Sequence, residues 1–157
     1  MDKKIHTIEY ETSTYKNLKD SKLKELIDQT ILFTSNAYAP YSHFKVSACL
    51  QLSSGEILKG ANVENASYPV SICAERTLLS HAVSNYPNDK IEVITIYADS
   101  DAKTILSPCG LCRQTLIELE TRQKQAIIIC LIAKNGNIVR FKSAADLLPF
   151  KFDHTYL

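Results

Sequence analysis

Two hydrophobic periods alternate along the chain, one typical of helices and the other of strands. After an N-cap at Asp20 or Ser21, apolar and threonine positions recur at helical spacing to near Ala39 and Pro40, which predicts a helix there. These positions are Leu23, Leu26, Ile27, Thr30, Ile31 and Thr34. The elements predicted after this helix are a hairpin at 45–64, a helix at 69–83, a strand at 91–98, a helix at 109–120, strands at 126–133 and 137–141, and a short helix at 143–148.

Strands separated by helices predict an α/β fold. Such strands pair in parallel through right-handed crossovers, whereas the hairpin adds an antiparallel pair. We therefore expect a three-layer α/β/α architecture, with helices on both faces of a mixed five-stranded sheet. Residues 1–20 are polar with weak periodicity and are interpreted as an N-terminal extension, so the folded domain is expected to span residues 21–157.

Composition and charge limit the classes of partner. The chain of 157 residues is 45% hydrophobic and 22% charged, which suits one globular domain, and its net charge is +1. Its basic residues are scattered, so we expect no nucleic-acid partner. No apolar signal region is present, and no segment approaches the roughly 20 apolar residues of a membrane span, so we expect a cytoplasmic protein without a membrane partner. Five cysteines, an odd number, in a reducing compartment favour metal binding or burial over disulfides.

A glutamate stands on the apolar face of the second predicted helix. Leu78, Leu79, Ala82 and Val83 form that face, and stepping back three, four or seven residues from them leads to Glu75. Burial of an ionised carboxylate without a partner is costly or raises its pKa. The position therefore calls for a cation, a proton or a metal-bound group beside Glu75.

Three cysteines are suited to bind one metal ion near Glu75. Cys109 and Cys112 are three residues apart on the inward face of their helix, about 60° apart around its axis. Residues two apart on an ideal helix diverge by about 200°, so Cys73 and Glu75 approach one metal only if Cys73 is an N-cap with non-helical dihedral angles. Three thiolates suit Zn²⁺, and three protein ligands leave the fourth tetrahedral position for water, as in catalytic sites.

Simpler interpretations of the same residues stay open at this point. A lone CxxC in an α/β protein is also typical of a redox pair or of two buried cysteines. Cys49 and Cys130 lie within predicted strands, and we expect them to be buried as small hydrophobic side chains. Nothing in the sequence marks a histidine as a metal ligand; the four histidines are His6, His43, His81 and His154.

Four ordered sequence blocks, which cover about residues 21–152, carry a resemblance to a known family. CAER at 73–76 followed by PCGLCRQ at 108–114 resembles the zinc nucleoside and nucleobase deaminases. AYAPYSHFKVSACL at 37–50 and GANVENASY at 60–68 narrow the resemblance to the small cytidine deaminases. The resemblance implies a cytidine deaminase-like fold over residues 21–157.

The resemblance also implies a reaction and roles for the motif residues. The zinc thiolates fall on Cys73, Cys109 and Cys112, with one Zn²⁺ per subunit, and the proton shuttle falls on Glu75. Arg76 matches an arginine that compensates the charge of the thiolates. The implied reaction uses a zinc-activated water to convert cytidine and 2′-deoxycytidine into uridine and 2′-deoxyuridine with release of ammonia, a step of pyrimidine salvage.

Polar side chains after the hairpin offer a grip on the substrate sugar. Asn62 and Glu64 are two apart, hence on one side of an extended segment, where an amide and a carboxylate together suit vicinal ribose hydroxyls. An alternating half-exposed strand explains the same pattern, and the resemblance favours sugar binding. It also implies that Phe44 packs against the base and that the backbone of Ala74 and Ser107 completes the base pocket.

Subunit contacts are implied by the resemblance alone. The small cytidine deaminases are homotetramers with active sites at subunit borders, and Tyr68 and Phe152 match positions that reach a neighbouring site. In LLPFKF at 147–152, Phe150 stands where the family has a small residue and competes with Phe152 for that role.

Three other functions stay open. A structural zinc module would use a fourth ligand, and no further Cys or His lies near the motifs. A deaminase of polynucleotides would carry a basic, aromatic groove, which the charge balance does not support. The LLPFKF tail leaves open a deaminase that acts on an N4-substituted cytosine nucleoside.

Overall fold

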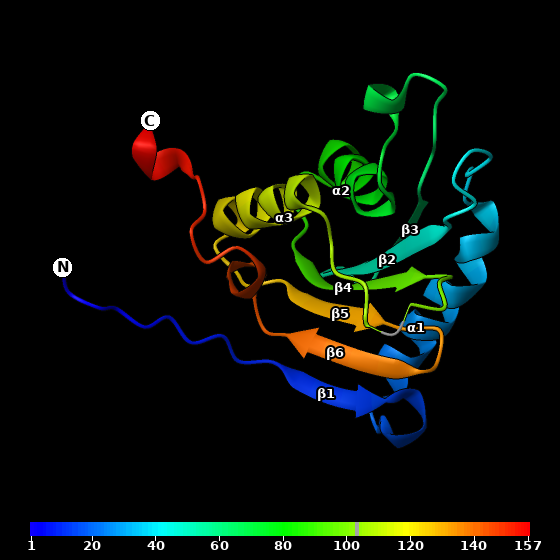
Figure 1. Cartoon of the computed structure of the whole chain (residues 1–157), viewed down its shortest axis with the longest axis horizontal. Helices are drawn as coiled ribbons and strands as arrows, with labels where there is room; N and C mark the ends of the chain where they lie inside the picture. Colours follow the sequence, from blue (N-terminus) through cyan, green and yellow to red (C-terminus); the bar gives the residue numbers. More distant parts are fainter. Residues whose placement is uncertain (103) are drawn as a thin grey trace.

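A six-stranded sheet forms the middle layer of the protein, with α1 (Ser21–Phe33) on one face and α2 (Ala74–Asn85) and α3 (Gly110–Gln123) on the other (Figure 1). The computed structural model describes residues 1–102 and 104–157. The strands are β1 Glu11–Thr14, β2 Val46–Leu52, β3 Ile57–Ala61, β4 Ile91–Ala98, β5 Ile128–Ile132 and β6 Asn137–Phe141. Their order across the sheet is β1-β6-β5-β4-β2-β3. The expected three-layer α/β/α architecture is confirmed.

The sheet is mixed, as predicted, but it has six strands rather than five. β4 and β5 are parallel and are joined by the α3 crossover, whereas β2–β3, β2–β4, β5–β6 and β1–β6 are antiparallel. The additional strand, β1, lies within the polar segment 1–20. Its sequence, ETST, lacks hydrophobic alternation because β1 is an exposed edge strand. An ion pair of 3.3 Å between Arg140 and Glu11 joins it to β6.

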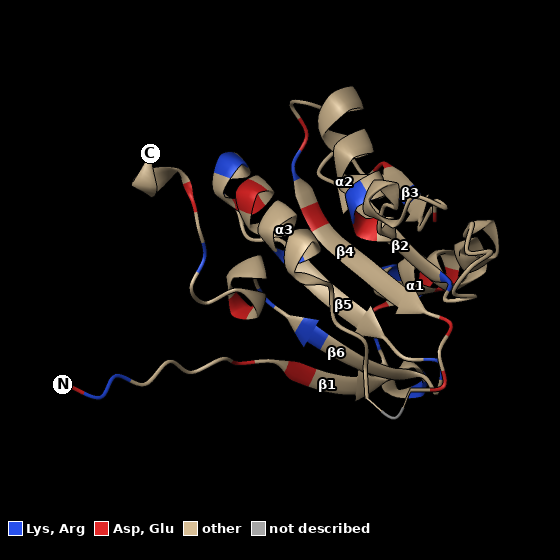
Figure 2. Ribbon diagram, turned by 45° about the horizontal axis from the view of Figure 1, so that its top comes forward, with Lys and Arg blue, Asp and Glu red and all other residues tan. Residues whose placement is uncertain are grey.

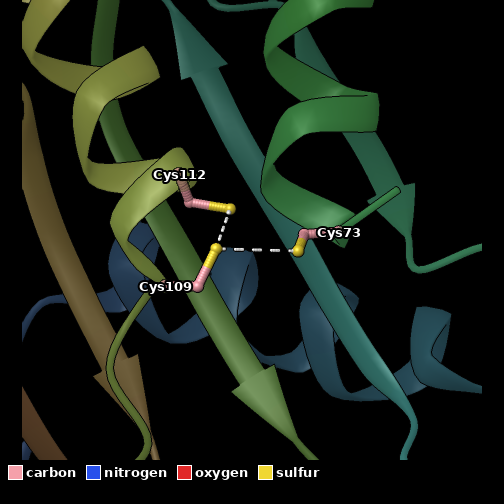
Figure 3. Close-up of side chains that lie close together, drawn as sticks. All are labelled: Cys73, Cys109 and Cys112. Carbon is pink, nitrogen blue, oxygen red and sulfur yellow. Dashed lines mark hydrogen bonds between the residues drawn. The ribbon is translucent and has the colours of Figure 1, made fainter. Parts of the chain in front are cut away.

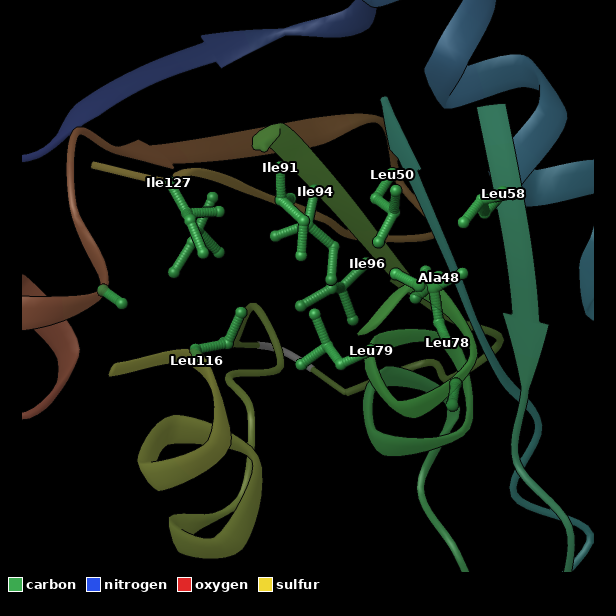
Figure 4. Close-up of a cluster of buried hydrophobic side chains, with 14 of the residues drawn as sticks. Ala48, Leu50, Leu58, Leu78, Leu79, Ile91, Ile94, Ile96, Leu116 and Ile127 are labelled. Atoms are coloured by element: carbon green, nitrogen blue, oxygen red, sulfur yellow. The ribbon is translucent and has the colours of Figure 1, made fainter. Parts of the chain in front are cut away.

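The two parallel strands are buried on both faces, which explains their nearly continuous apolar sequences. Their side chains that face α2 and α3 belong to the larger core cluster, shown in Figure 4: Ile91, Ile94, Ile96, Ala98, Ile129 and Leu131. A second cluster lies toward α1: Leu23, Ile27, Tyr97, Cys130, Ile132 and Ile138. Cys49 and Cys130 are fully buried, as expected.

α1 is held on the sheet by buried hydroxyl groups as well as by apolar contacts. Thr30 hydrogen-bonds to Thr95 of β4 over 2.5 Å, and Thr34, just after the helix, bonds to Ser47 of β2 over 2.6 Å. Each of these hydroxyls is buried and paired, as buried polar groups require. The pairs therefore fix the position of α1 along the sheet.

Two helices are shorter than their sequence patterns predict. α1 ends at Phe33, where a 3₁₀ turn follows. α2 begins at Ala74 rather than near residue 69, because Tyr68–Val70 forms a separate 3₁₀ turn and Ile72 forms an extended bridge with Val63. Cys73 is therefore the residue directly before α2.

Close contact between β3 and α2 depends on a glycine. A Cβ atom at Gly60 would lie 2.8 Å from the carbonyl oxygen of Ala74 and 2.8 Å from the Cβ atom of Leu78. Only a residue without a side chain leaves room for the helix at this distance. Gly60 thereby determines how near the first turn of α2 lies to the sheet.

Charged residues are distributed over all three layers. Figure 2 shows acidic and basic segments interspersed on helices, strands and loops. Within residues 1–102 and 104–157, no helix combines the length and the apolar composition that crossing a bilayer requires. The expected absence of a nucleic-acid partner stays a prediction.

Candidate metal and active site

Three cysteine thiols meet where the first turns of α2 and α3 approach each other (Figure 3). Cys73 is the N-cap of α2 with extended dihedral angles (φ −70°, ψ 153°), the conformation that its spacing from Glu75 requires. Cys109 is the N-cap of α3, and Cys112 lies in the first turn of that helix. The Sγ atoms of Cys73 and Cys109 are 3.9 Å apart, and those of Cys109 and Cys112 are 3.5 Å apart.

The spacing of the three sulfur atoms fits a zinc ion. In a tetrahedral site with Zn–S bonds of about 2.3 Å, neighbouring sulfurs are about 3.8 Å apart. All three Sγ atoms here lie within 4.8 Å of one another, and the described part of the chain contains no second such group of Cys, His, Asp or Glu. Three thiolates without a fourth protein ligand leave one coordination position open, which is typical of catalytic zinc. The cluster therefore fits one zinc ion.

The surroundings favour deprotonated thiols. The free N–H groups of the first helical turns carry partial positive charge, which stabilises thiolates. Hydrogen bonding with Cys112 lowers the pKa of Cys73 to about 6, and the positive charge of Arg76 contributes to the lowering. The same interaction with Cys73 raises the pKa of Cys112.

Glu75 lies on the inner side of α2, in its first turn. Only 4% of its surface is exposed, and its neighbours Ala74 and Leu78 are fully buried. Burial raises the pKa of its carboxyl group. Glu75 borders the same cavity as Cys73 and Cys109, so it can exchange a proton with a molecule bound beside the thiols.

A cavity of about 370 Å³ opens beside the cysteines and Glu75. It brings together most of the residues predicted to form the site: Phe44, Asn62, Glu64, Cys73, Ala74, Glu75, Ser107 and Cys109. Its other lining residues, which the sequence patterns do not single out, are Val46, Val63, Ser71, Ile72 and Leu106. The mostly apolar lining, with few polar groups, is typical of small-molecule sites.

The two predicted sugar ligands also bind the protein's own backbone. Asn62 accepts a hydrogen bond from the N–H of Val46 (2.8 Å) and donates one to the carbonyl of Phe44 (2.9 Å). Glu64 accepts from the N–H of Tyr41 (2.9 Å), from the N–H of Ser42 (3.2 Å) and from the Ser42 hydroxyl. These hydrogen bonds lower the pKa of Glu64, the Ser42 hydroxyl contributing most. The two side chains therefore hold the loop 41–46 against the cavity.

Tyr68 and Phe152 do not line this cavity; neither do Arg76 and Cys112, although Cys112 lies with the other two thiols. Tyr68 is 73% exposed and packs edge-to-face on Tyr41, with ring centroids 6.3 Å apart. Phe152 stacks on Tyr156 at 5.6 Å, and its carbonyl accepts a hydrogen bond of 2.9 Å from Gln114. Their expected contribution to a neighbouring subunit's site stays a prediction.

Arg113 organises the loop that carries Cys109. Its guanidinium donates to the carbonyl of Pro108 (2.8 Å), the hydroxyl of Ser107 (3.0 Å) and the carbonyl of Leu147 (3.2 Å). The only sequence signal for it is its place directly after the second cysteine of PCGLCR. The fork geometry of an arginine is needed to reach three acceptors at once.

Comparisons with known proteins agree with this geometry. Residues 20–130 match the family described as the cytidine and deoxycytidylate deaminase zinc-binding region. A cytidine deaminase of Halalkalibacterium halodurans is 44% identical over 94 residues, which cover 60% of this chain and 69% of that protein. One of Mycoplasma pneumoniae is 38% identical over 108 residues, which cover 69% of this chain and 74% of that protein. The crystal structure of a cytidine deaminase from Burkholderia pseudomallei, 37% identical, matches with a TM-score of 0.71 over 82% of this chain and 97% of that chain. With its three thiols at the matching motifs, the chain therefore belongs to the zinc-dependent cytidine and deoxycytidylate deaminase family.

Proposed function

We propose that this protein deaminates cytidine and 2′-deoxycytidine hydrolytically, forming uridine and 2′-deoxyuridine with release of ammonia. The observation that carries the proposal is that the buried carboxyl group of Glu75 borders the same cavity as Cys73 and Cys109, two of the three clustered thiols. A structural zinc site would be closed by a fourth protein ligand. The similar proteins of Halalkalibacterium halodurans and Burkholderia pseudomallei bear the name cytidine deaminase, which supports this substrate.

Glu75 carries protons between the reacting atoms. Cys73, Cys109 and Cys112 would hold Zn²⁺, which when bound would supply a Lewis acid that lowers the pKa of water. In this proposal Glu75 accepts a proton from the water whose oxygen bonds to C4 of the cytosine ring, and delivers it to N3. A second transfer through Glu75 takes the remaining water proton to the amino nitrogen, and ammonia leaves as the C4–N bond breaks.

The raised pKa of Glu75 suits a group that must both hold and release a proton near neutral pH. Arg76, whose positive charge already acts on Cys73, offsets part of the negative charge that three thiolates bring. In this proposal Phe44 packs against the pyrimidine, and the backbone of Ala74 and Ser107 binds its polar edge. Asn62 and Glu64 hold the sugar hydroxyls at the other end of the cavity.

We further propose a homotetramer that works in pyrimidine salvage in the cytoplasm. Large apolar side chains are exposed near the cavity loops and along the tail, among them Tyr68 (73%), Phe152 (59%) and Phe150 (93%). Exposed apolar side chains gathered in this way are typical of contact surfaces between proteins. In a tetramer, Tyr68 and Phe152 would approach a neighbouring subunit's cavity, and Phe150 is the alternative to Phe152. Sedimentation of the purified protein tests the assembly, and Phe150→Ala beside Phe152→Ala tests which ring supports turnover.

The experiment that tests the proposed reaction measures zinc content and deamination in the same sample. Purified protein is incubated with cytidine, 2′-deoxycytidine, deoxycytidylate, an N4-methylated cytidine and a cytosine-containing oligonucleotide, and formation of the uracil product is followed by absorbance. We expect about one zinc per chain and fastest turnover of the two unmodified nucleosides. Full zinc loading without turnover would identify a structural zinc module, and faster turnover of another substrate would replace the proposed one.

A further inference from the structure

The loop from Tyr41 to Phe44 joins the proposed base end of the cavity, at Phe44, to the proposed sugar end, at Glu64. Phe44 and Glu64 line the cavity, whereas Ser42 is exposed, does not line the cavity and hydrogen-bonds to both. His43, between Ser42 and Phe44, has a φ of 58°, a left-handed conformation that is uncommon for a residue with a side chain. The turn at His43 brings the Phe44 N–H back onto the hydroxyl oxygen of Ser42 at 3.0 Å.

The Ser42 hydroxyl limits the acceptor positions of the Glu64 carboxylate that are open to a ligand. A carboxylate offers about four lone-pair sites, about two on each oxygen. Oε2 of Glu64 accepts both backbone N–H groups of residues 41 and 42, so it is saturated. Oε1 accepts the hydroxyl of Ser42, which leaves one acceptor position on Oε1. Ser42 therefore selects which lone pair of Glu64 is available to a ligand.

The hydroxyl of Ser42 also ties Glu64 to the base-contacting residue. Its oxygen accepts from the Phe44 N–H while its hydrogen goes to Glu64, and Asn62 holds the carbonyl of the same Phe44. No other side chain links these two parts of the lining through a single atom among the hydrogen bonds of the described residues. Loss of the hydroxyl would free one oxygen of Glu64 and one backbone N–H together.

We propose that Ser42 is a positioning residue for substrate specificity: it orients Glu64 so that its remaining lone pair accepts a hydroxyl of the substrate's sugar. This inference rests on the proposed function, in which Glu64 binds the sugar. Ser42 itself is not among the residues that line the cavity. Its effect is therefore greater on the binding of nucleosides that have sugar hydroxyls than on the binding of those that lack them.

Because Glu64 is ionised, the oriented carboxylate favours a sugar that carries a hydroxyl donor. Hydrogen bonds from the loop lower the pKa of Glu64, so the group is a carboxylate at neutral pH and can only accept hydrogen bonds. A sugar hydroxyl can donate to it. A hydrogen in place of that hydroxyl leaves the oriented lone pair without a partner, which is costly for a charged group.

The test compares Ser42→Ala with wild type on nucleosides that differ only in the sugar hydroxyls. KM and kcat are measured with cytidine and 2′,3′-dideoxycytidine, and equilibrium binding of uridine and 2′,3′-dideoxyuridine is measured by calorimetry on zinc-loaded protein. Ser42→Thr keeps the hydroxyl. Ser54→Ala is the matched control. Ser54 lies in the turn between β2 and β3, away from the cavity, and its hydroxyl also donates to a carboxylate, that of Asp89, over 3.0 Å.

We expect Ser42→Ala to raise KM for cytidine about tenfold with kcat little changed, and to change KM for the dideoxynucleoside much less. Ser42→Thr should retain wild-type discrimination, and Ser54→Ala should be indistinguishable from wild type. Glu64→Gln should lose the same discrimination, and adding Ser42→Ala to it should cause no further loss, because the two residues act through one contact.

An equal loss of affinity for both nucleosides in Ser42→Ala would overturn the inference, since it would show that Ser42 has a merely structural role. Unchanged discrimination, or a wild type that does not distinguish the sugars, would overturn it as well. The binding measurement separates this inference from the proposed function. Wild-type protein that binds uridine selectively through Ser42 but deaminates nothing would support the role of Ser42 and contradict the proposed reaction.

Discussion

Replacement of Gly60 by alanine tests whether α2 must lie this close to β3 for the site to form. The new Cβ would be 2.8 Å from the Ala74 carbonyl oxygen and 2.8 Å from the Leu78 Cβ. Non-bonded carbon atoms pack at about 3.5 Å or more, so α2 must shift by at least about half an ångström. Both obstacles are fixed parts of the helix, and rotation of a side chain cannot relieve the contact.

Two opposing effects decide the change in stability. Alanine restricts the unfolded chain, which stabilises a protein by about 0.4–1 kcal/mol at a compatible position. Overpacking in a core costs about 1–3 kcal/mol, so we expect Gly60→Ala to lower the free energy of unfolding by about 1–2 kcal/mol. Activity should suffer more, because Glu75 directly follows Ala74. A displacement near 1 Å can cost about 10²-fold in rate, and we expect kcat/KM for cytidine to fall at least about tenfold.

Urea unfolding and kcat/KM of the zinc-loaded variant provide the measurement. Lys59→Ala is the control, because Lys59 is the adjacent residue of β3 and its side chain is exposed. This control should change neither quantity. Gly60→Ala with wild-type stability and wild-type kcat/KM would refute the reasoning, because it would show that α2 does not depend on the glycine for its position.

Three further predictions concern the zinc loop, the buried thiols and the sugar-side loop. Arg113→Ala should weaken zinc binding about tenfold or more, because removal of residues that orient metal ligands commonly has an effect of this size. Competition with a chromophoric chelator measures the zinc affinity. An unchanged affinity would contradict the role of the three hydrogen bonds of Arg113. After chelation of zinc, Cys73 and Cys109 should be the first cysteines to react with a thiol reagent. Burial raises the pKa of Cys49, and that of Cys130 to about 12, so Cys49 and Cys130 should react only on unfolding. Peptide mapping that finds Cys130 labelled in folded protein would contradict this prediction. The pKa of Glu64 is lowered in the folded state, so its ionisation stabilises the fold above the ordinary carboxyl pKa of about 4.3 and ceases to do so as the pH falls through the folded value. Glu64→Gln should therefore lower stability to urea at pH 7, with a difference from wild type that shrinks below about pH 4; a difference independent of pH would count against the charged contact.

The metal cluster was predictable because its geometry is local. Cys109 and Cys112 are three residues apart at one helix start, and the two-residue spacing of Cys73 and Glu75 allows one arrangement, with Cys73 outside the helix. The structure has this arrangement. Burial of Glu75 followed from helical periodicity alone, since the leucines one turn further along the same face are also buried.

Features that depend on contacts between distant segments were not predictable in this way. β1 is a polar edge strand whose existence depends on pairing with β6, more than 120 residues further along the chain. The hydrogen bonds of Asn62 and Glu64 to the loop 41–46 join residues 16 and 23 positions apart, and alternation of polar residues gives no sign of them. The boundary between the extension and the domain at residue 20 stays a prediction.

The side chains proposed to contact other subunits are exposed on the single chain. Tyr68 and Phe152 lie outside the cavity of their own chain, so a role in the site requires a second copy. Phe150 and Phe152 are both exposed, and burial within one chain does not distinguish them. The resemblance to the small cytidine deaminases is the source of that prediction, and activity of the two alanine variants decides between them.

Turnover of cytidine by Glu75→Gln at full zinc occupancy tests the central claim most directly. Glutamine matches glutamate in size but cannot accept and return a proton, and the substitution leaves the three thiols unchanged. The account predicts wild-type zinc content with kcat reduced by about 10²–10⁴-fold, the usual contribution of general acid–base catalysis. A variant that retains its zinc and turns over cytidine within a few-fold of wild type would contradict the claim that Glu75 carries the proton.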